Sequence, residues 1–182
     1  MASNQDHGTL PLPAFSDPKP TVLIVAAPFY RGVADGLIAG ARATLDEADA
    51  GHETIEVPGA LEIPTAIRLA QSHFDGFVAL GCVIRGETTH YETVCNDSSR
   101  GLTLLGLDGL AIGNGILTCE TMDQAEVRAD PAQLNKGGGA AAAALHLIAL
   151  ARRFQTPPAR KLPNPDDETI LLAGQSSLTR TA

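Results

Sequence analysis

The feature that most constrains the fold is a repeated alternation between short apolar runs and longer segments with helical periodicity. Residues 21–27 (TVLIVAA) form a continuous apolar run, which is typical of a strand covered on both faces of a sheet. From Arg31 to about residue 48 the apolar side chains recur at helical spacing, and Gly51 ends the pattern. Because consecutive parallel strands are joined by crossover helices, the alternation predicts an α/β fold with a parallel sheet and helices on both faces.

The alternation continues to about residue 154 and divides the chain into expected elements. The predicted strands cover residues 21–27, 52–57, 74–84 and 110–118. The predicted helices cover residues 31–48, 62–72, 88–105, 122–129 and 136–154. The small side chains of Ala140–Ala144 on the last helix suggest a smooth surface on which a neighbouring subunit packs closely.

Proline content marks the two ends of the chain. Residues 1–20 contain four prolines and read as an extended arm with no obvious use within its own subunit. Residues 155–182 also contain several prolines and read as a mobile tail. Residues 21–154 are therefore expected to form one α/β domain between an arm and a tail.

Composition excludes several classes of protein. A net charge of −8 argues against general attraction to nucleic acid or to an anionic membrane. No apolar run approaches the length of a membrane span, and the first residues do not resemble a secretory signal. The three cysteines form no CxxC pair, which favours reduced thiols in a cytoplasmic protein and gives no indication of a zinc site.

The segment from Gly81 to Tyr91 (GCVIRGETTHY) carries the densest chemistry. It follows an apolar run typical of a buried strand, and it contains several hydrogen-bond donors and one imidazole. Ligands of open α/β sheets bind beyond the carboxyl ends of the strands. His90 can exchange a proton near neutral pH, and Arg85 with Thr88 could help to hold an anion. The competing interpretation is a polar loop whose threonines cap the next helix.

Three other segments are expected at the same edge of the sheet: residues 28–31, residues 57–62 and the neighbourhood of Asn114. Phe29 could stack on a flat heterocycle, or it could simply cover the core. Glu62 could accept hydrogen bonds from a ligand, or it could stabilise a helix start through the helix dipole. The residues alone leave both choices open.

A second group of donors lies near the last helix. Arg128 and Lys136 flank residues 130–135, and Lys136 is followed by three glycines. The order of a Walker A motif is absent, so we interpret the glycines as positions of close packing. Lys136 could form a Schiff base or give electrostatic support, and we favour the second role.

Four motifs in this order resemble the 6,7-dimethyl-8-ribityllumazine synthase family over about residues 21–154. They are Val57–Pro64 (VPGALEIP), Leu80–Tyr91 (LGCVIRGETTHY), Gly115–Thr118 (GILT) with Glu120, and Asn135–Gly137 (NKG). The resemblance implies a flavodoxin-like three-layer sandwich with a four-stranded parallel sheet. It also implies condensation of 5-amino-6-(D-ribitylamino)uracil with 3,4-dihydroxy-2-butanone 4-phosphate, releasing phosphate and water, with no redox cofactor or metal.

The resemblance further assigns roles to individual residues. His90 matches the proton-transfer residue, and Arg128 matches the phosphate-binding arginine, supplied with Asn114 across a subunit boundary. Phe29 would stack on the pyrimidine. The remaining residues expected to contact substrates are Ala60, Leu61, Glu62, Cys82, Val83, Ile84, Glu87 and Thr88.

Three positions depart from the family's common pattern. Asn114 replaces an aromatic residue, so stacking from that side is lost, and Leu61 replaces a frequent Phe. Glu87 stands where a small residue is common, and its carboxylate would repel a phosphate unless it turned away. We therefore expect Glu87 to contribute its backbone N–H.

The resemblance implies a homo-oligomer built from pentamers and names riboflavin synthase as a candidate partner. Decamers and an icosahedral shell both stay open. The rival functions are a non-catalytic flavin- or lumazine-binding module, a shell-forming scaffold protein and, more weakly, a lysine-dependent aldolase. The joint presence of His90 and Arg128 favours the enzyme, because proton transfer and a phosphate leaving group need both.

Overall fold

The computed structural model describes residues 10–155, which form four strands and five α-helices in alternation. The strands are β1 (Thr21–Ala26), β2 (Gly51–Glu56), β3 (Gly76–Ile84) and β4 (Ile112–Cys119). The α-helices are α1 (Arg31–Glu47), α2 (Ile63–Ala70), α3 (His90–Leu107), α4 (Met122–Ala129) and α5 (Lys136–Gln155). A short 3₁₀ helix, η1 (Ala60–Glu62), precedes α2.

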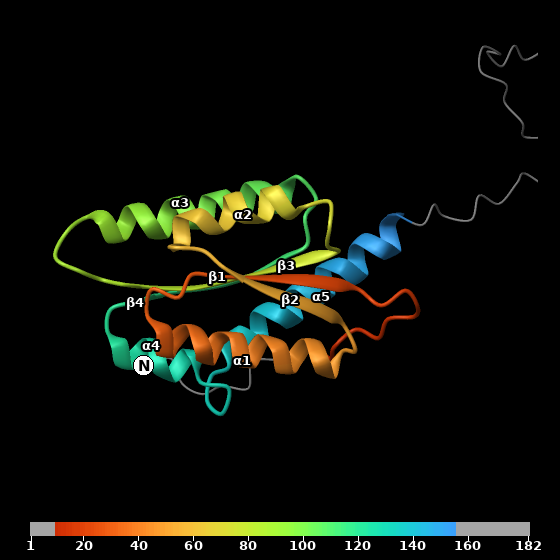
Figure 1. Cartoon of the computed structure of the whole chain (residues 1–182), viewed down its shortest axis with the longest axis horizontal. Helices are drawn as coiled ribbons and strands as arrows, with labels where there is room; N and C mark the ends of the chain where they lie inside the picture. Colours follow the sequence, from red (N-terminus) through yellow and green to blue (C-terminus); the bar gives the residue numbers. More distant parts are fainter. Residues whose placement is uncertain (1–9, 156–182) are drawn as a thin grey trace, which may run out of the picture.

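All strands of the sheet are parallel, in the order β2-β1-β3-β4 (Figure 1). This is the flavodoxin-like order, and it confirms the predicted fold class. The order reverses between β1 and β3, because β2 lies on one side of β1 and β3 on the other. In doubly wound sheets the crevice beyond this reversal is where ligands bind.

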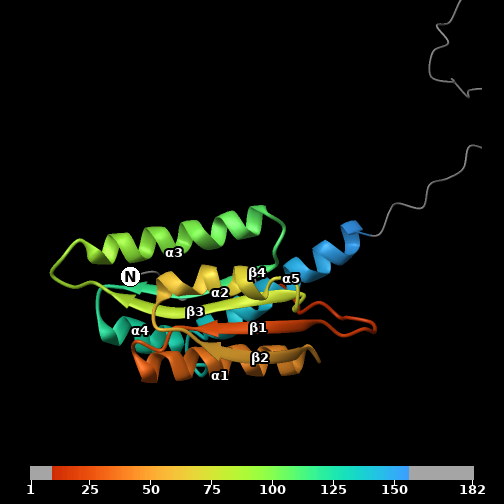
Figure 2. The same cartoon turned by 45° about the horizontal axis from the view of Figure 1, so that its top comes forward.

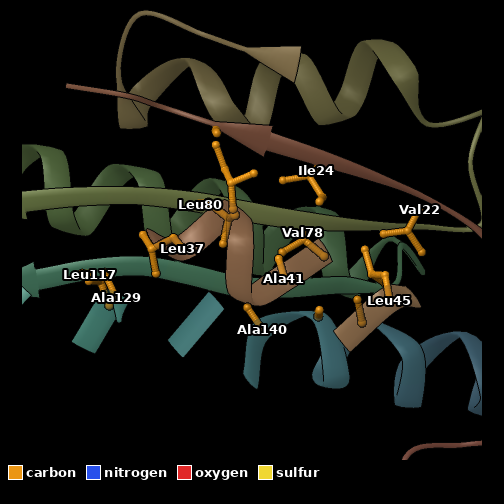
Figure 3. Close-up of a cluster of buried hydrophobic side chains, with 14 of the residues drawn as sticks. Val22, Ile24, Leu37, Ala41, Leu45, Val78, Leu80, Leu117, Ala129 and Ala140 are labelled. Carbon is orange, nitrogen blue, oxygen red and sulfur yellow. The ribbon is translucent and has the colours of Figure 1, made fainter. Parts of the chain in front are cut away.

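Helices cover both faces of the sheet, as predicted. Helices α2 and α3 lie on one face, and α1, α4 and α5 lie on the other (Figures 1 and 2). Alternate residues of β1 and β3 point into two separate cores, which is why residues 22–26 and 77–80 are apolar at every position. The larger core joins Ile24 and Leu80 of the sheet to Leu37 of α1 and Ala140 of α5 (Figure 3).

Most predicted boundaries agree with the structure to within two residues. The second helix is split, because η1 occupies its predicted start and α2 begins at Ile63. Pro64 lies in the first turn of α2, where its missing N–H removes no helical hydrogen bond.

Glycines allow α5 to approach the rest of the chain closely, as the sequence indicated. A Cβ atom on Gly137 would lie 2.0 Å from the backbone oxygen of Leu37, and one on Gly113 would lie 1.8 Å from that of Ala140. The expectation that Ala140–Ala144 packs against a neighbour is wrong for Ala140, Ala141 and Ala144, because these three are buried in the chain's own core. Small residues allow close packing against any surface, so their spacing did not distinguish the two cases.

Part of the predicted arm also packs on its own chain. Leu12 and Phe15 contact the larger core, and the Arg152 guanidinium donates a hydrogen bond of 2.8 Å to the backbone oxygen of Pro18. The interpretation of residues 1–20 as an arm without use in its own subunit is therefore wrong for residues 10–20. Residues 1–9 and the predicted tail from residue 156 onward lie outside the described part. Within residues 10–155, no helix is both long and apolar enough to cross a membrane.

Candidate active site

A cavity of about 420 Å³ opens beside the carboxyl ends of β1 and β3, at the reversal of strand order. Its walls come from the segments after β1 and β2, the end of β3 and the first turn of α3. The structure thus brings together most of the residues singled out in the sequence. The cavity is lined by Ala27, Phe29, Tyr30, Pro58, Gly59, Ala60, Leu61, Glu62, Cys82, Val83, Ile84, Gly86, Thr88, His90, Tyr91 and Val94.

Phe29 presents its ring to this cavity and to solvent. Its side chain is 74% exposed, and its ring meets Tyr30 edge to face with centroids 5.1 Å apart. A phenyl ring that covered the core would be largely buried, so the structure favours the first of the two interpretations of Phe29. Its flat face is available for stacking on a planar ligand.

Glu62 lies at the rim of the cavity, where η1 passes into α2. Its side chain makes no capping hydrogen bond to α2, although the residue occupies the N-cap position. A Cβ atom on Gly59 would lie 2.9 Å from Oε2 of Glu62, so the missing side chain of Gly59 leaves room for this carboxylate. Glu62 thus lines the cavity, and its carboxylate has no helix-capping hydrogen bond.

His90 is the first residue of α3 and is exposed at the cavity. Thr89 occupies the N-cap position of α3 but makes no side-chain capping hydrogen bond. Thr88 lines the cavity, whereas Glu87 is exposed and does not. The cavity therefore receives a hydroxyl and an imidazole from this turn, and the Glu87 carboxylate stays outside.

Cys82 places a neutral thiol in the cavity wall. Burial, and to a smaller extent the neighbouring Cys119, together raise the pKa of this thiol to about 12. At neutral pH the sulfur is therefore protonated and weakly nucleophilic. All three cysteines are free thiols.

Asn114, Arg128 and Lys136 lie in a second cavity of about 490 Å³, between β4 and the helices α4 and α5. The two cavities share no residue. Arg128 donates a hydrogen bond of 2.9 Å to the backbone oxygen of Gln124, and among residues 10–155 it pairs with no carboxylate. The chain on its own thus keeps this group of donors apart from His90.

The expected position of Asn114 is corrected by the structure. It lies within β4 rather than in a loop at the carboxyl edge, and its side chain accepts a hydrogen bond of 3.0 Å from the N–H of Ile116. The predicted strand of residues 110–118 already contained Asn114, so the error was to place this residue at the carboxyl end of that strand. Glu120, which follows β4, stands at the edge instead.

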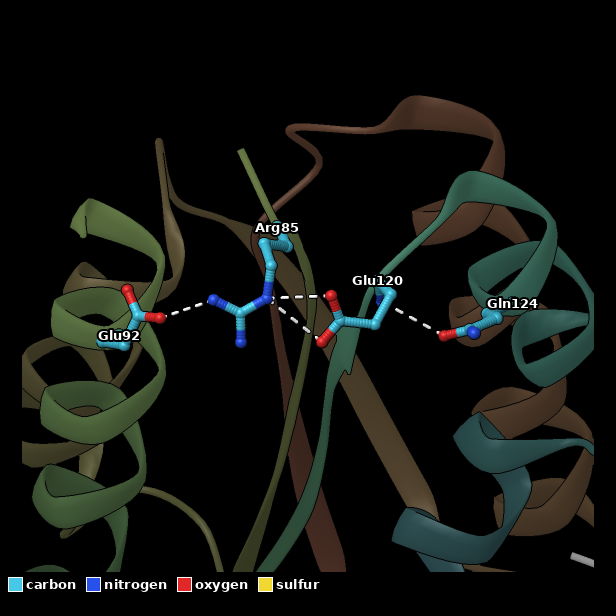
Figure 4. A network of polar contacts seen from close by, with 4 residues as sticks. All are labelled: Arg85, Glu92, Glu120 and Gln124. Atoms are coloured by element: carbon cyan, nitrogen blue, oxygen red, sulfur yellow. Dashed lines mark hydrogen bonds and ion pairs between the residues drawn. The ribbon is translucent and has the colours of Figure 1, made fainter. Parts of the chain in front are cut away.

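A polar network beside the first cavity joins the ends of β3 and β4 to the helices α3 and α4 (Figure 4). Arg85 lies between Glu92 of α3 and Glu120 after β4, and Nε of Arg85 donates to both Glu120 oxygens at 2.8 and 3.1 Å. The side-chain oxygen of Gln124 in α4 accepts a hydrogen bond from the N–H of Glu120. The pairing with Arg85 lowers the pKa of the Glu92 carboxyl.

Sequence reasoning did not predict this network. Glu120 belonged to one of the matched motifs, but its partner Arg85 is 35 residues away. The available signal was a pair of opposite charges, Arg85 after β3 and Glu120 after β4, at the ends of two neighbouring strands. Tyr30, Tyr91 and Val94 also line the first cavity without having been singled out.

Comparison with known proteins agrees with this geometry. The family model described as 6,7-dimethyl-8-ribityllumazine synthase matches residues 19–152. A 6,7-dimethyl-8-ribityllumazine synthase from Jannaschia sp. (strain CCS1) is 60% identical over 159 residues, covering 86% of this chain and 88% of that relative. One from Sphingopyxis alaskensis is 56% identical over 135 residues, covering 73% and 96%. The chain belongs to the 6,7-dimethyl-8-ribityllumazine synthase family.

Proposed function

We propose that this chain condenses 5-amino-6-(D-ribitylamino)uracil with 3,4-dihydroxy-2-butanone 4-phosphate to form 6,7-dimethyl-8-ribityllumazine in riboflavin biosynthesis. One observation carries the proposal. In a chain of this family, an exposed aromatic ring, a carboxylate and an imidazole meet in one cavity at the reversal of strand order. These three groups correspond to what a planar, polyhydroxylated amine needs for stacking, hydrogen bonding and proton transfer.

The pyrimidine substrate fits the side of the cavity formed after β1 and β2. Phe29 stacks on the ring, and Glu62 accepts hydrogen bonds from ring N–H or ribityl hydroxyl groups. The apolar walls from Ala60, Val83 and Ile84 exclude water around these contacts. Excluding water strengthens the polar contacts, because fewer solvent molecules compete for the same donors and acceptors.

His90 acts in proton transfer at the other side of the cavity. The substrate amine adds to the ketone carbon, the carbonyl oxygen leaves as water, and the phosphate group is then eliminated. The enol left by that elimination becomes a ketone, and the ribityl-bearing nitrogen closes the second ring on its carbon with loss of a second water. Each step moves a proton near neutral pH, which suits an imidazole. Cys82 takes no proton in this scheme, because its pKa of about 12 keeps the thiol neutral.

The leaving phosphate requires the second cavity. Arg128 offers a planar pair of N–H donors to phosphate oxygens, Lys136 adds a positive charge, and Asn114 lies beside them. Since these groups lie in a different cavity from His90, a complete site needs a neighbouring copy of the chain. We therefore propose a homo-oligomer in which the second cavity of one copy faces the first cavity of the next.

The pentamer is our proposed unit of assembly, by the family resemblance. Decamers, an icosahedral shell and association with riboflavin synthase are extensions that size measurements and co-purification test. We also propose a cytoplasmic location and no cofactor. The free thiols support the first, and a condensation with no net oxidation or reduction supports the second.

The family match and the paired cavities favour catalysis over the rival functions. A binding module would need Phe29 and Glu62 but neither His90 nor Arg128. An aldolase would use the Lys136 amine to form a Schiff base with a carbonyl substrate. In the proposed reaction one substrate brings its own amine. We therefore keep Lys136 as electrostatic support.

The decisive experiment mixes purified protein with both substrates and follows lumazine absorbance together with phosphate release. We expect one phosphate for each lumazine formed. Protein with only one substrate is the control for background release. Lumazine formation no faster than the spontaneous reaction, in protein of confirmed fold, would refute the proposal.

A further inference from the structure

Arg85 contacts two residues in the first turn of α3 and two residues at the end of β4. Its Nη1 donates to Glu92, its guanidinium carbon lies 4.2 Å from the centre of the Tyr91 ring, and its Nε donates to Glu120. The N–H of Arg85 also donates a hydrogen bond of 2.9 Å to the backbone oxygen of Cys119. One residue thus fastens the first turn of α3 to the end of β4 (Figure 4).

The first turn of α3 has few other restraints. Residues 85–90 are all exposed, and Thr89 gives α3 no side-chain cap. Within residues 10–155 the His90 imidazole makes no hydrogen bond to another group, so its position depends on the helix that carries it. Tyr91 and Glu92, the two residues held by Arg85, follow His90 directly.

We propose that Arg85 is a positioning residue, which holds the start of α3 so that the His90 imidazole lies at the mouth of the cavity. The inference rests on the proposed function, because it assigns His90 the proton transfers. Only a planar fork with several donors reaches Glu92 and Glu120 at once, so arginine is required. Pairing with two carboxylates raises the pKa of Arg85 and keeps it charged throughout the physiological range.

The contacts of Arg85 affect the position of the start of α3 more than the free energy of folding. Exposed ion pairs contribute little to the free energy of folding, because water screens them. Small displacements of a catalytic group nevertheless change rates greatly, and a shift of about 1 Å costs up to about 100-fold. Replacement of Arg85 should therefore lower turnover while leaving folding and substrate binding nearly intact.

The test is a kinetic comparison of Arg85→Met, His90→Ala and the double variant. We expect Arg85→Met to lower kcat by about 10- to 100-fold and to change KM for each substrate by less than about three-fold. In the His90→Ala background, Arg85→Met should cause no further loss, because the two residues act through one step. Arg85→Lys should fall between wild type and Arg85→Met.

Arg68→Met is the matched control. Arg68 is also exposed and pairs with a carboxylate, Asp108 at 3.7 Å, but it lines neither the first nor the second cavity. We expect wild-type kinetics from this variant. Glu92→Gln and Glu120→Gln remove one partner each and serve if Arg85→Met does not fold.

Hydrogen exchange of the full-length protein gives a readout that does not depend on activity. Amides that donate to the start of α3, beginning with the N–H of Thr93 bonded to the oxygen of Thr89, should exchange faster in Arg85→Met than in Arg68→Met. Unchanged exchange, or an additive loss of kcat in the double variant, overturns the inference even if wild type makes lumazine. If wild type forms no lumazine, the proposed function fails first, and unchanged exchange then refutes the positioning role independently.

Discussion

Phe29 and His90 contribute little to the stability of the chain, although both are well placed. Large apolar side chains of this fold are mostly buried between sheet and helices, yet Phe29 leaves 74% of its surface exposed. His90 is likewise exposed and has no internal partner among residues 10–155. Residues that the fold does not need for packing are those whose loss should affect function alone.

Replacing His90 tests this separation directly. We expect His90→Ala to lower turnover by about 100-fold or more, because a positioned acid/base group is lost. The melting temperature should stay within a few degrees of wild type, since the side chain is exposed. Steady-state assays and thermal unfolding measure the two effects, and wild-type turnover would remove His90 from the mechanism.

Cys82 predicts a dependence of stability on alkaline pH. The folded-state pKa is about 12, above the ordinary thiol value of about 8.5. The thiol therefore contributes stability that is complete below about pH 8.5 and is lost as the pH rises toward 12. Denaturant unfolding of wild type between pH 8 and 10.5 should show a larger decline than unfolding of Cys82→Ala, and equal declines would contradict the assignment.

At the scale of elements, α5 is fixed by close backbone approaches. Gly137 faces the backbone of Leu37 in α1, and Ala140 faces Gly113 of β4. These contacts hold α5 against α1 on one face of the sheet and against β4 of the sheet itself. They also fix the second cavity, because Lys136 begins α5 and Asn114 lies on β4.

Gly137→Ala should destabilise the chain by about 1–3 kcal/mol, because the new methyl group overlaps backbone that cannot move aside easily. The matched control is Gly106→Ala in α3, where no atom lies within 4 Å of the added carbon. That control should be neutral or should stabilise by up to about 1 kcal/mol through helix propensity. Equal effects of the two substitutions in denaturant unfolding would contradict the close approach.

Residue patterns predicted the parts of the fold that depend on local chemistry. The runs of β1 and β3 are apolar at every position because helices cover both faces, and that pattern is visible without a structure. The first cavity was also foreseeable, since parallel strands bring the segments after β1, β2 and β3 to one edge. Asn114 lies in the predicted strand of residues 110–118, but it was expected at the carboxyl edge, and the third residue of β4 lies well before that edge.

Side-chain geometry across distant segments was not predictable in the same way. Arg85 could be recognised as a donor, but its pairing with Glu120 requires the relative position of two strand ends. The burial of Ala140 and Ala144 depends on which surface α5 meets, and small residues suit an interior and an interface equally. The separation of Arg128 from His90 depends on two cavities that share no residue, and no sequence pattern shows that arrangement.

At the scale of the whole molecule, the two cavities predict that a single chain is inactive. Purified His90→Ala and Arg128→Ala proteins should each have little activity. Mixed after dissociation and reassembly, they should regain a fraction of the wild-type rate, because some sites then receive His90 from one chain and Arg128 from the other. No recovery would indicate that each chain holds a complete site.

Solution size offers an independent measurement of the same arrangement. Light scattering should give a particle several times heavier than the 18.9 kDa chain, with five chains as the smallest active species. Specific activity should decrease on dilution below the concentration at which the particle dissociates. A fully active particle of one chain would exclude the shared site.

His90 and Arg128 lie on one chain but in separate cavities, which also shapes how the gene can change. In the proposed shared site, a substitution at the rim of one cavity is repeated in all copies, so each new side chain meets an unchanged partner at every site. Two alleles with different defects, one in each cavity, should complement each other in a diploid or merodiploid cell. Because one gene encodes both His90 and Arg128, the two halves of the site are always inherited together.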